Sequence, residues 1–112
     1  TYPKRLECDL APLDFETLGA IRFLPLKRKA FPCYDLALTS LEQGDNYPCA
    51  LNGAGEVAVR AFLDERIPFT AIADTMDYAL QKTIRAKADS YEVLQSTDIT
   101  ARALAEEYVN KV

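Results

Sequence analysis

The stretch CALNGAGEVAVRAFL, residues 49–63, decides the fold of this 112-residue chain. Its apolar side chains recur at helical spacing, which predicts one buried helix face. Asn52 is a residue type that accepts backbone N–H groups at a helix start, and Glu56 complements the helix dipole one turn later. We therefore expect a helix that begins near Asn52, with Asn52 and Glu56 as its structural cap. The predicted buried face comprises Ala54, Val57, Ala58, Ala61 and Phe62.

A helix is also predicted before this stretch, from residue 31 onward. Pro32 suits a first helical turn, and Gly44 follows the last apolar residue, as is typical of a helix end. Residues 44–48 contain Gly, Asp, Asn and Pro, and we expect them to form a loop. The predicted buried face, widened by Leu36 and Ala37, consists of Phe31, Tyr34, Leu38 and Leu41.

Two further helices are predicted after it. Thr70 is positioned to cap one, and residues 82–90 are polar and read as a loop. Residues 91–94 are expected to form one separate turn, and Thr97 followed by Asp98 to open the last helix. The predicted inward residues are Ile72, Met76, Ala79, Leu80 and Ile84 in the third helix, and Ala101, Leu104, Ala105, Tyr108 and Val112 in the last.

The first thirty residues follow a different pattern, with scattered prolines and no long helical period. Asp14 is predicted to cap a single helical turn that Gly19 ends. Residues 20–24 alternate apolar and polar side chains, which predicts a short strand. The fold class is therefore mainly α: a four-helix-type bundle preceded by an extended connector with one short strand.

Composition excludes several classes of function. The formal net charge is −4, which argues against a nucleic-acid-binding surface, and no apolar run approaches the roughly 20 residues of a membrane span. The chain has no histidine and three scattered cysteines, so neither a zinc site nor a Ser-His or Cys-His nucleophile is predicted. We interpret Cys8, Cys33 and Cys49 as reduced thiols of a cytosolic protein.

Each of the remaining motifs has two interpretations, a functional one and a purely structural one. Residues 53–55 lack the third glycine of a dinucleotide-binding loop, although a free helix start could still hold an anion. Three of the many carboxylates could form a metal site, but their spacing suits solvent-facing helix surfaces better. The basic run at residues 27–29 suits phosphate contact or, more simply, a solvated loop. We therefore assign no catalytic, cofactor-binding or metal residue to this chain.

Five stretches, in order, resemble the C-terminal region of the 1-deoxy-D-xylulose 5-phosphate reductoisomerases. They cover nearly the whole chain, and their order is more specific than any one motif. Two departures stand out: Gly53 and Gly55 occupy positions where the family usually has Ala and Asn, and residues 27–29 are basic. Close approach of the backbone at these positions to a neighbour would explain the glycines. The five stretches are Tyr2-Pro3-Lys4-Arg5, Pro12-Leu13-Asp14-Phe15 with Leu18 and Ile21-Arg22-Phe23, Phe31-Pro32-Cys33-Tyr34-Asp35-Leu36-Ala37, Ala50-Leu51-Asn52 through Phe62-Leu63, and Ile67-Pro68-Phe69-Thr70-Ala71-Ile72.

The resemblance implies a parent enzyme that uses NADPH and Mg²⁺ or Mn²⁺ to convert 1-deoxy-D-xylulose 5-phosphate to 2-C-methyl-D-erythritol 4-phosphate in isoprenoid biosynthesis. Its catalytic motifs belong to N-terminal and central domains that this chain lacks. The resemblance makes residues 1–30 the tail of the central domain plus a connector, and residues 31–112 the C-terminal helical domain. The chain begins at Thr1 rather than at methionine, which fits a part of a longer protein.

These expectations combine into one main hypothesis about the chain, with one alternative. We expect a bacterial, cytoplasmic chain that is inactive alone, binds no cofactor, nucleic acid or membrane, and has the missing domains as partners. Its uncovered apolar surface predicts self-association, by strand pairing or exchange of the N-terminal arm. The alternative is a free-standing helical protein-interaction module, which an upstream dinucleotide-binding domain would exclude.

Overall fold

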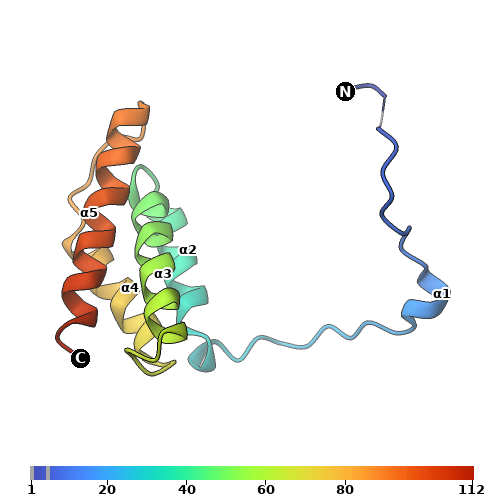
Figure 1. Ribbon diagram of the computed structural model, residues 1–112, viewed down its shortest axis with the longest axis horizontal. Helices are drawn as coiled ribbons and strands as arrows, with labels where there is room; N and C mark the ends of the chain where they lie inside the picture. Colours follow the sequence, from blue (N-terminus) through green and yellow to red (C-terminus); the bar gives the residue numbers. More distant parts are fainter. Residues whose placement is uncertain (1, 5) are drawn as a thin grey trace.

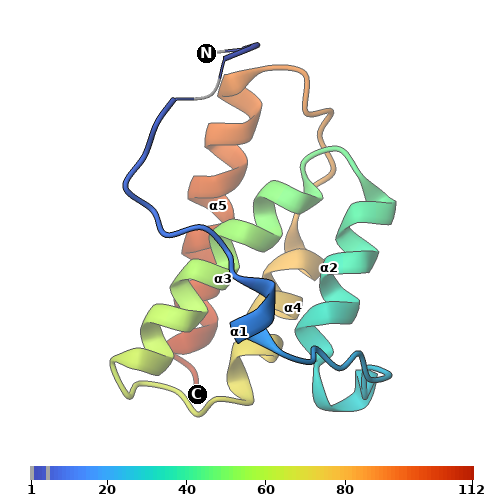
Figure 2. The ribbon, with the colours of Figure 1, turned by 90° about the vertical axis from the view of Figure 1, so that its right-hand side faces the viewer.

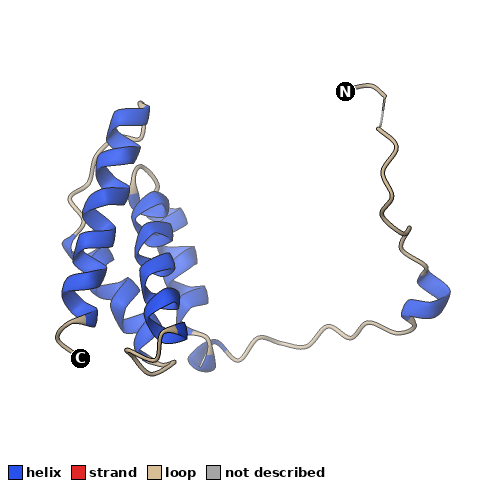
Figure 3. Ribbon diagram, in the orientation of Figure 1, coloured by secondary structure: helices blue, strands red, loops and turns tan. Residues whose placement is uncertain are grey.

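The computed structural model describes residues 2–4 and 6–112. Within these residues the chain is helical, with no strand, and four long helices form a bundle (Figures 1 and 3). The predicted mainly α fold class is confirmed. The elements, in chain order, are α1 (Phe15–Leu18), the 3-10 helix η1 (Arg28–Ala30), α2 (Pro32–Gln43), α3 (Tyr47–Leu63), α4 (Ala71–Lys82) and α5 (Tyr91–Val109).

Helix α3 is the centre of the bundle and packs against α2, α4 and α5. Its buried face is made mostly of alanine, and the facing positions of α4 and α5 are also small. Small side chains let helix axes approach closely, so the core is a narrow seam rather than a layer of large residues. The buried alanines are Ala50, Ala54, Ala58 and Ala61 of α3, Ala71, Ala73 and Ala79 of α4, and Ala101 and Ala105 of α5.

Helix α3 begins earlier than the sequence predicted. It starts at Tyr47, with Pro48 in its first turn, so Asn52 lies inside the helix and does not cap it. Glu56 is correspondingly in the middle of the helix, not one turn from its start. The prediction was wrong because a proline that read as part of a loop suits a first helical turn, where its missing N–H has no partner to lose.

Asn46, just before α3, is the residue that ties the bundle's loops together. It is buried, and its amide donates to Ile84 O at 3.0 Å and to Thr97 Oγ1 at 3.1 Å. Its Oδ1 accepts the Ala86 N–H at 3.0 Å. One side chain thus joins the α2–α3 loop to the α4–α5 loop and to α5, across 38 to 51 residues of sequence.

Helix α5 is one continuous helix instead of a turn followed by a helix. Ser90 caps it by accepting the Val93 N–H at 3.3 Å. Thr97, predicted to open a helix, lies in its interior, where it accepts the hydrogen bond from Asn46. In its polar mid-section the hydroxyls donate to preceding carbonyls of the same helix, as Ser96 Oγ does to Val93 O at 2.9 Å.

The buried faces of the other helices differ partly from prediction. In α2 the inward residues are Cys33, Leu36 and Ser40, whereas Phe31, Tyr34 and Leu41 are exposed. Leu36, which the prediction included, is thus confirmed, and Leu38 is half-buried. Because α2 has apolar residues on more than one face, periodicity alone also selected exposed positions. Ile84 and Val112, predicted inward, lie beyond the ends of α4 and α5 and are also exposed. The predicted helix end at Gly44, which has φ 65°, is confirmed. Thr70 lies directly before α4 as predicted, but its side chain makes no capping hydrogen bond.

Residues 6–27, which we call the arm, extend away from the bundle (Figure 1). The predicted turn is present as α1: Asp14 Oδ1 accepts the Glu16 N–H at 2.9 Å, and Gly19 ends the helix with φ 68°. The predicted strand at residues 20–24 is absent, because a strand needs a neighbour and this one has none in the chain. The arm's large apolar side chains are all exposed.

Candidate functional site

The bundle carries one extensive apolar hollow, which we call the groove, with a volume of about 760 Å³. Helix α3 and the start of α2 form its walls, and Ile72 and Met76 of α4 form its floor. Both wall helices lie on the side of the bundle that faces the arm (Figure 2). The lining residues are Cys33, Pro48, Leu51, Asn52, Gly55, Glu56, Val59, Arg60, Leu63, Ile72 and Met76.

The groove contains both residues that the sequence had assigned to a helix cap. Asn52 and Glu56 lie one turn apart on the α3 wall, and Arg60 follows one turn later. Their spacing of four residues gives a polar edge along an otherwise apolar surface. Asn52 and Glu56 are therefore surface residues of α3 beside a hollow, and their role in starting a helix is excluded by the position of Tyr47.

Charged partners hold this polar edge in place. Arg102 of α5 reaches Glu56 Oε2 at 2.8 Å and Asp98 Oδ2 at 2.7 Å. The hydrogen bonds that Arg102 donates to Asp98 and Glu56 raise the pKa of its guanidinium above the ordinary value. Arg60 pairs with Asp64 at 2.9 Å. Among the residues that the structure describes, the Asn52 side chain alone on this edge makes no hydrogen bond.

Sequence reasoning missed Arg102, although a signal for it existed. Asp98 and Arg102 stand four residues apart, a spacing that places opposite charges side by side on a helix. The link to Glu56 spans 46 residues and could not be seen before the packing of α3 on α5 was known. Gly53 fits this packing: a Cβ there would lie 2.7 Å from Asp98 Oδ1. The close approach expected for the glycines is thus found at Gly53.

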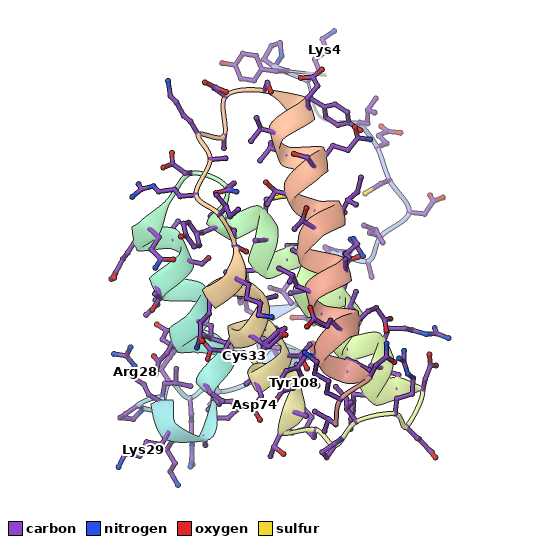
Figure 4. All side chains as sticks on the ribbon, turned by 90° about the vertical axis from the view of Figure 1, so that its left-hand side faces the viewer. Lys4, Arg28, Lys29, Cys33, Asp74 and Tyr108 are labelled. Atoms are coloured by element: carbon purple, nitrogen blue, oxygen red, sulfur yellow. The ribbon has the colours of Figure 1, made fainter. Side chains whose placement is uncertain are left out.

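The other candidates from the sequence do not assemble into a reactive site. Within residues 2–4 and 6–112, no three His, Cys, Asp or Glu side chains gather as metal ligands. The basic run lies at η1, before α2 begins, and Arg28 there pairs with Asp35 of α2. The hydrogen bond to Asp35 raises the pKa of Arg28. Figure 4 shows Arg28 and Lys29 at the same end of the bundle as Asp74. Mixed charge of this kind favours the solvated-loop interpretation.

The three cysteines are free thiols in separate places. Cys8 is exposed on the arm, Cys33 lines the groove, and Cys49 donates a hydrogen bond to Leu94 O at 3.3 Å. Burial raises the pKa of the Cys49 thiol, and the nearby Asp98 carboxylate adds to the effect. No helix of the described chain is long and apolar enough to cross a membrane.

The fold defines the class of the protein as a helical-bundle domain with an apolar groove and a projecting arm. Residues 1–104 match the family model described as DXP reductoisomerase C-terminal domain. This chain therefore belongs to the DXP reductoisomerase family, in its C-terminal domain, and the resemblance noted from the five stretches is confirmed.

Relatives and solved structures agree. The chain is 43% identical over 108 residues to 1-deoxy-D-xylulose 5-phosphate reductoisomerase of Ralstonia pickettii, covering 96% of this chain and 27% of the relative. The Shewanella woodyi relative is 36% identical over 112 residues, covering 100% of this chain and 28% of its own length. The chain thus spans little more than a quarter of the relatives it matches.

Among solved structures, the reductoisomerase of Zymomonas mobilis in complex with NADPH superposes with a TM-score of 0.86 at 33% identity. That similarity covers 99% of this chain and 29% of the other. A DOX-P reductoisomerase in complex with magnesium superposes with a TM-score of 0.81 at 30% identity, covering 97% of this chain and 30% of the other. Since 99% of the chain is covered, the likeness to the first structure includes the arm.

Proposed function

We propose that this chain is the non-catalytic structural domain of a reductoisomerase that converts 1-deoxy-D-xylulose 5-phosphate to 2-C-methyl-D-erythritol 4-phosphate. In this proposal residues 1–30 are the end of the central domain and the connector, and residues 31–112 are the helical domain. The domain buttresses the catalytic part of a bacterial, cytoplasmic enzyme. The observation that carries the proposal is the family match over residues 1–104, joined to a groove with a largely apolar lining.

NADPH and a divalent metal belong, in this proposal, to the preceding parts of the enzyme. The residues here do not fit either group: the described carboxylates form no cluster of three, and residues 53–55 run within a helix instead of forming a phosphate-binding loop. The relatives' solved structures were obtained with NADPH and with magnesium. We expect this chain alone to bind neither.

Activity measurements test the proposal directly. We define the chimera as the Ralstonia pickettii relative with its matching C-terminal region replaced by this chain. The chimera should oxidise NADPH in the presence of 1-deoxy-D-xylulose 5-phosphate and Mg²⁺, whereas this chain alone should not. NADPH oxidation by the chain alone, or a folded chimera without activity, would contradict the proposal. The rival, a free-standing interaction module, predicts the inactive chimera.

We also propose that the isolated chain self-associates. Its arm exposes a series of large apolar side chains, and such surfaces associate in water. Sedimentation velocity over a range of concentrations should show a shift towards larger species. Removal of residues 1–27 should reduce that shift, and a strictly monomeric full chain would exclude self-association. The exposed residues of the arm include Leu10, Leu13, Phe15, Leu18, Ile21 and Phe23.

A further inference from the structure

We propose that the groove is a docking surface for the polypeptide that precedes this domain in the reductoisomerase, and that Asn52 is its specific polar contact. The inference rests on the proposed function and deepens it, because it names the surface through which the domain buttresses the enzyme. In this arrangement the groove and the arm both contact the preceding part of the enzyme, which lies between them.

Asn52 supplies the first argument. Asparagine is a poorer helix former than alanine, so its presence inside α3 calls for a compensating role. The structure excludes the cap, and the Asn52 amide has no hydrogen-bond partner within the described chain. An Asn side chain offers two N–H donors and a carbonyl acceptor, a set that matches an exposed peptide group of a docked segment.

The apolar wall supplies the second argument. Leu63, 66% exposed, and Val59, 45% exposed, stand on the α3 wall above the flexible side chain of Met76. Contiguous apolar surface with a polar edge is typical of a protein interface. Methionine adapts its shape to a partner, which suits the floor of such a surface. Glu56 and Arg60 give the edge both signs of charge, which favours a protein over an anionic lipid or nucleic acid.

The arm identifies the occupant. Its helix α1 contacts no helix of the bundle, and the arm extends away from the bundle (Figure 1), yet a solved reductoisomerase superposes on 99% of this chain, the arm included. An apolar arm keeps an extended course in water only when another surface covers it. In that relative most of the polypeptide lies outside the matched region. Helices α2 and α3, which supply most of the groove's lining, lie on the side of the bundle that faces the arm (Figure 2), so the same polypeptide is placed to cover both.

Cys33 is a built-in reporter of the groove's occupancy. It lines the groove, whereas Cys49 lies beside α5 and serves as an internal control. Alkylation of each thiol would be followed by mass spectrometry in the isolated chain, at a concentration where it sediments as a monomer, and in the chimera. Cys33 should react at least about tenfold more slowly in the chimera, while the Cys49 rate changes little. Equal Cys33 rates would overturn the inference, whether or not the chimera is active.

Matched variants of the chimera separate docking from folding. Leu63→Asp should restore fast Cys33 alkylation, whereas Ile99→Asp, at a similarly exposed position of α5 outside the groove, should not. Asn52→Ala should leave the isolated chain at least as stable as the unaltered one, because alanine favours the helix. In the chimera the same substitution should accelerate Cys33 alkylation by about tenfold, the factor that corresponds to the loss of one good hydrogen bond. No acceleration in either groove variant would contradict the proposal. An inactive chimera with protected Cys33 would contradict only the proposed function.

Discussion

Gly53 of α3 lies against the side chain of Asp98 of α5, so closely that a Cβ at position 53 would stand 2.7 Å from Asp98 Oδ1. The contact lets the two longest helices approach, and the Asp98 carboxylate is held there by Arg102 at 2.7 Å. Gly53→Ala must therefore displace Asp98 and weaken this ion pair. We expect the loss to outweigh the helix propensity gained from alanine, with net destabilisation of about 1 kcal/mol in chemical unfolding.

Gly55 provides the matched control in the same helix. A Cβ at position 55 would meet only the Met76 side chain, at 3.3 Å from its Cε, and that flexible group can move aside. Gly55→Ala should stabilise the isolated chain by about 0.5–1 kcal/mol. In an Asp98→Ala background, Gly53→Ala should also become stabilising. Equal effects of the two glycine substitutions in the unaltered chain would show that the contact with Asp98 has no energetic consequence.

Asn46→Ala should be among the most damaging substitutions of a loop residue. It removes three side-chain hydrogen bonds and leaves the Ala86 N–H and the Thr97 hydroxyl with fewer partners in partly buried surroundings. We expect a loss of about 3 kcal/mol in the free energy of unfolding, from about 1 kcal/mol for each bond. Thr97→Val removes one of the three bonds and should cost about 1 kcal/mol. A loss below about 0.5 kcal/mol for Asn46→Ala would contradict this role.

The helix ends were predictable where a single residue determines them. Gly44 and Gly19 end their helices in the left-handed region, and Asp14 caps α1, because glycine and aspartate have strong local preferences. The start of α3 was not predictable, because proline is common both in loops and in the first turn of a helix, and Pro48 occupies such a first turn. The role of Thr97 was predicted wrongly for a related reason. It resembled a helix cap, but its hydroxyl accepts a hydrogen bond from Asn46, 51 residues away in the sequence.

The groove could not be predicted from periodicity. Asn52 and Glu56 were recognised as informative, but their explanation depended on a helix boundary that was five residues too late. A hollow between α2, α3 and α4 depends on which face of α2 turns inward, and the sequence pattern had selected Phe31 and Tyr34 instead of Cys33. Such a surface is set by how helices pack on one another, which local sequence specifies weakly.

The thiols should differ in reactivity. Cys8 is exposed, whereas burial raises the pKa of Cys49 and its thiol donates to Leu94 O. Because the thiolate is the reactive form, a maleimide at about pH 8 should alkylate Cys8 at least about tenfold faster than it alkylates Cys49. In denaturant the two rates should converge. Comparable rates in the folded chain would contradict the burial of Cys49.

Glu107 should make the bundle sensitive to acid. Its carboxylate accepts from Lys111 Nζ at 2.5 Å and from the Tyr78 hydroxyl at 2.7 Å, which joins α4 to the end of α5. The hydrogen bond from Lys111, followed by that from Tyr78, lowers the pKa of Glu107 from 4.5 to about 2. A lowered carboxyl pKa means that the folded state binds the proton more weakly than the unfolded state. The stabilisation is therefore fully present above about pH 4.5 and is lost as the pH falls towards 2.

Thermal unfolding of Glu107→Gln between about pH 2 and pH 7 tests the predicted direction of this pH dependence. The unaltered chain should unfold at a higher temperature than the variant above pH 4.5, and the two curves should converge as the pH approaches 2. Tyr78→Phe removes one of the hydrogen bonds and should reduce the pH-dependent difference without abolishing it, since the Lys111 contact remains. Added salt should narrow the difference further, because these side chains are partly exposed and their charges are screened. A difference that is independent of pH would mean that Glu107 contributes through packing and not through its charge.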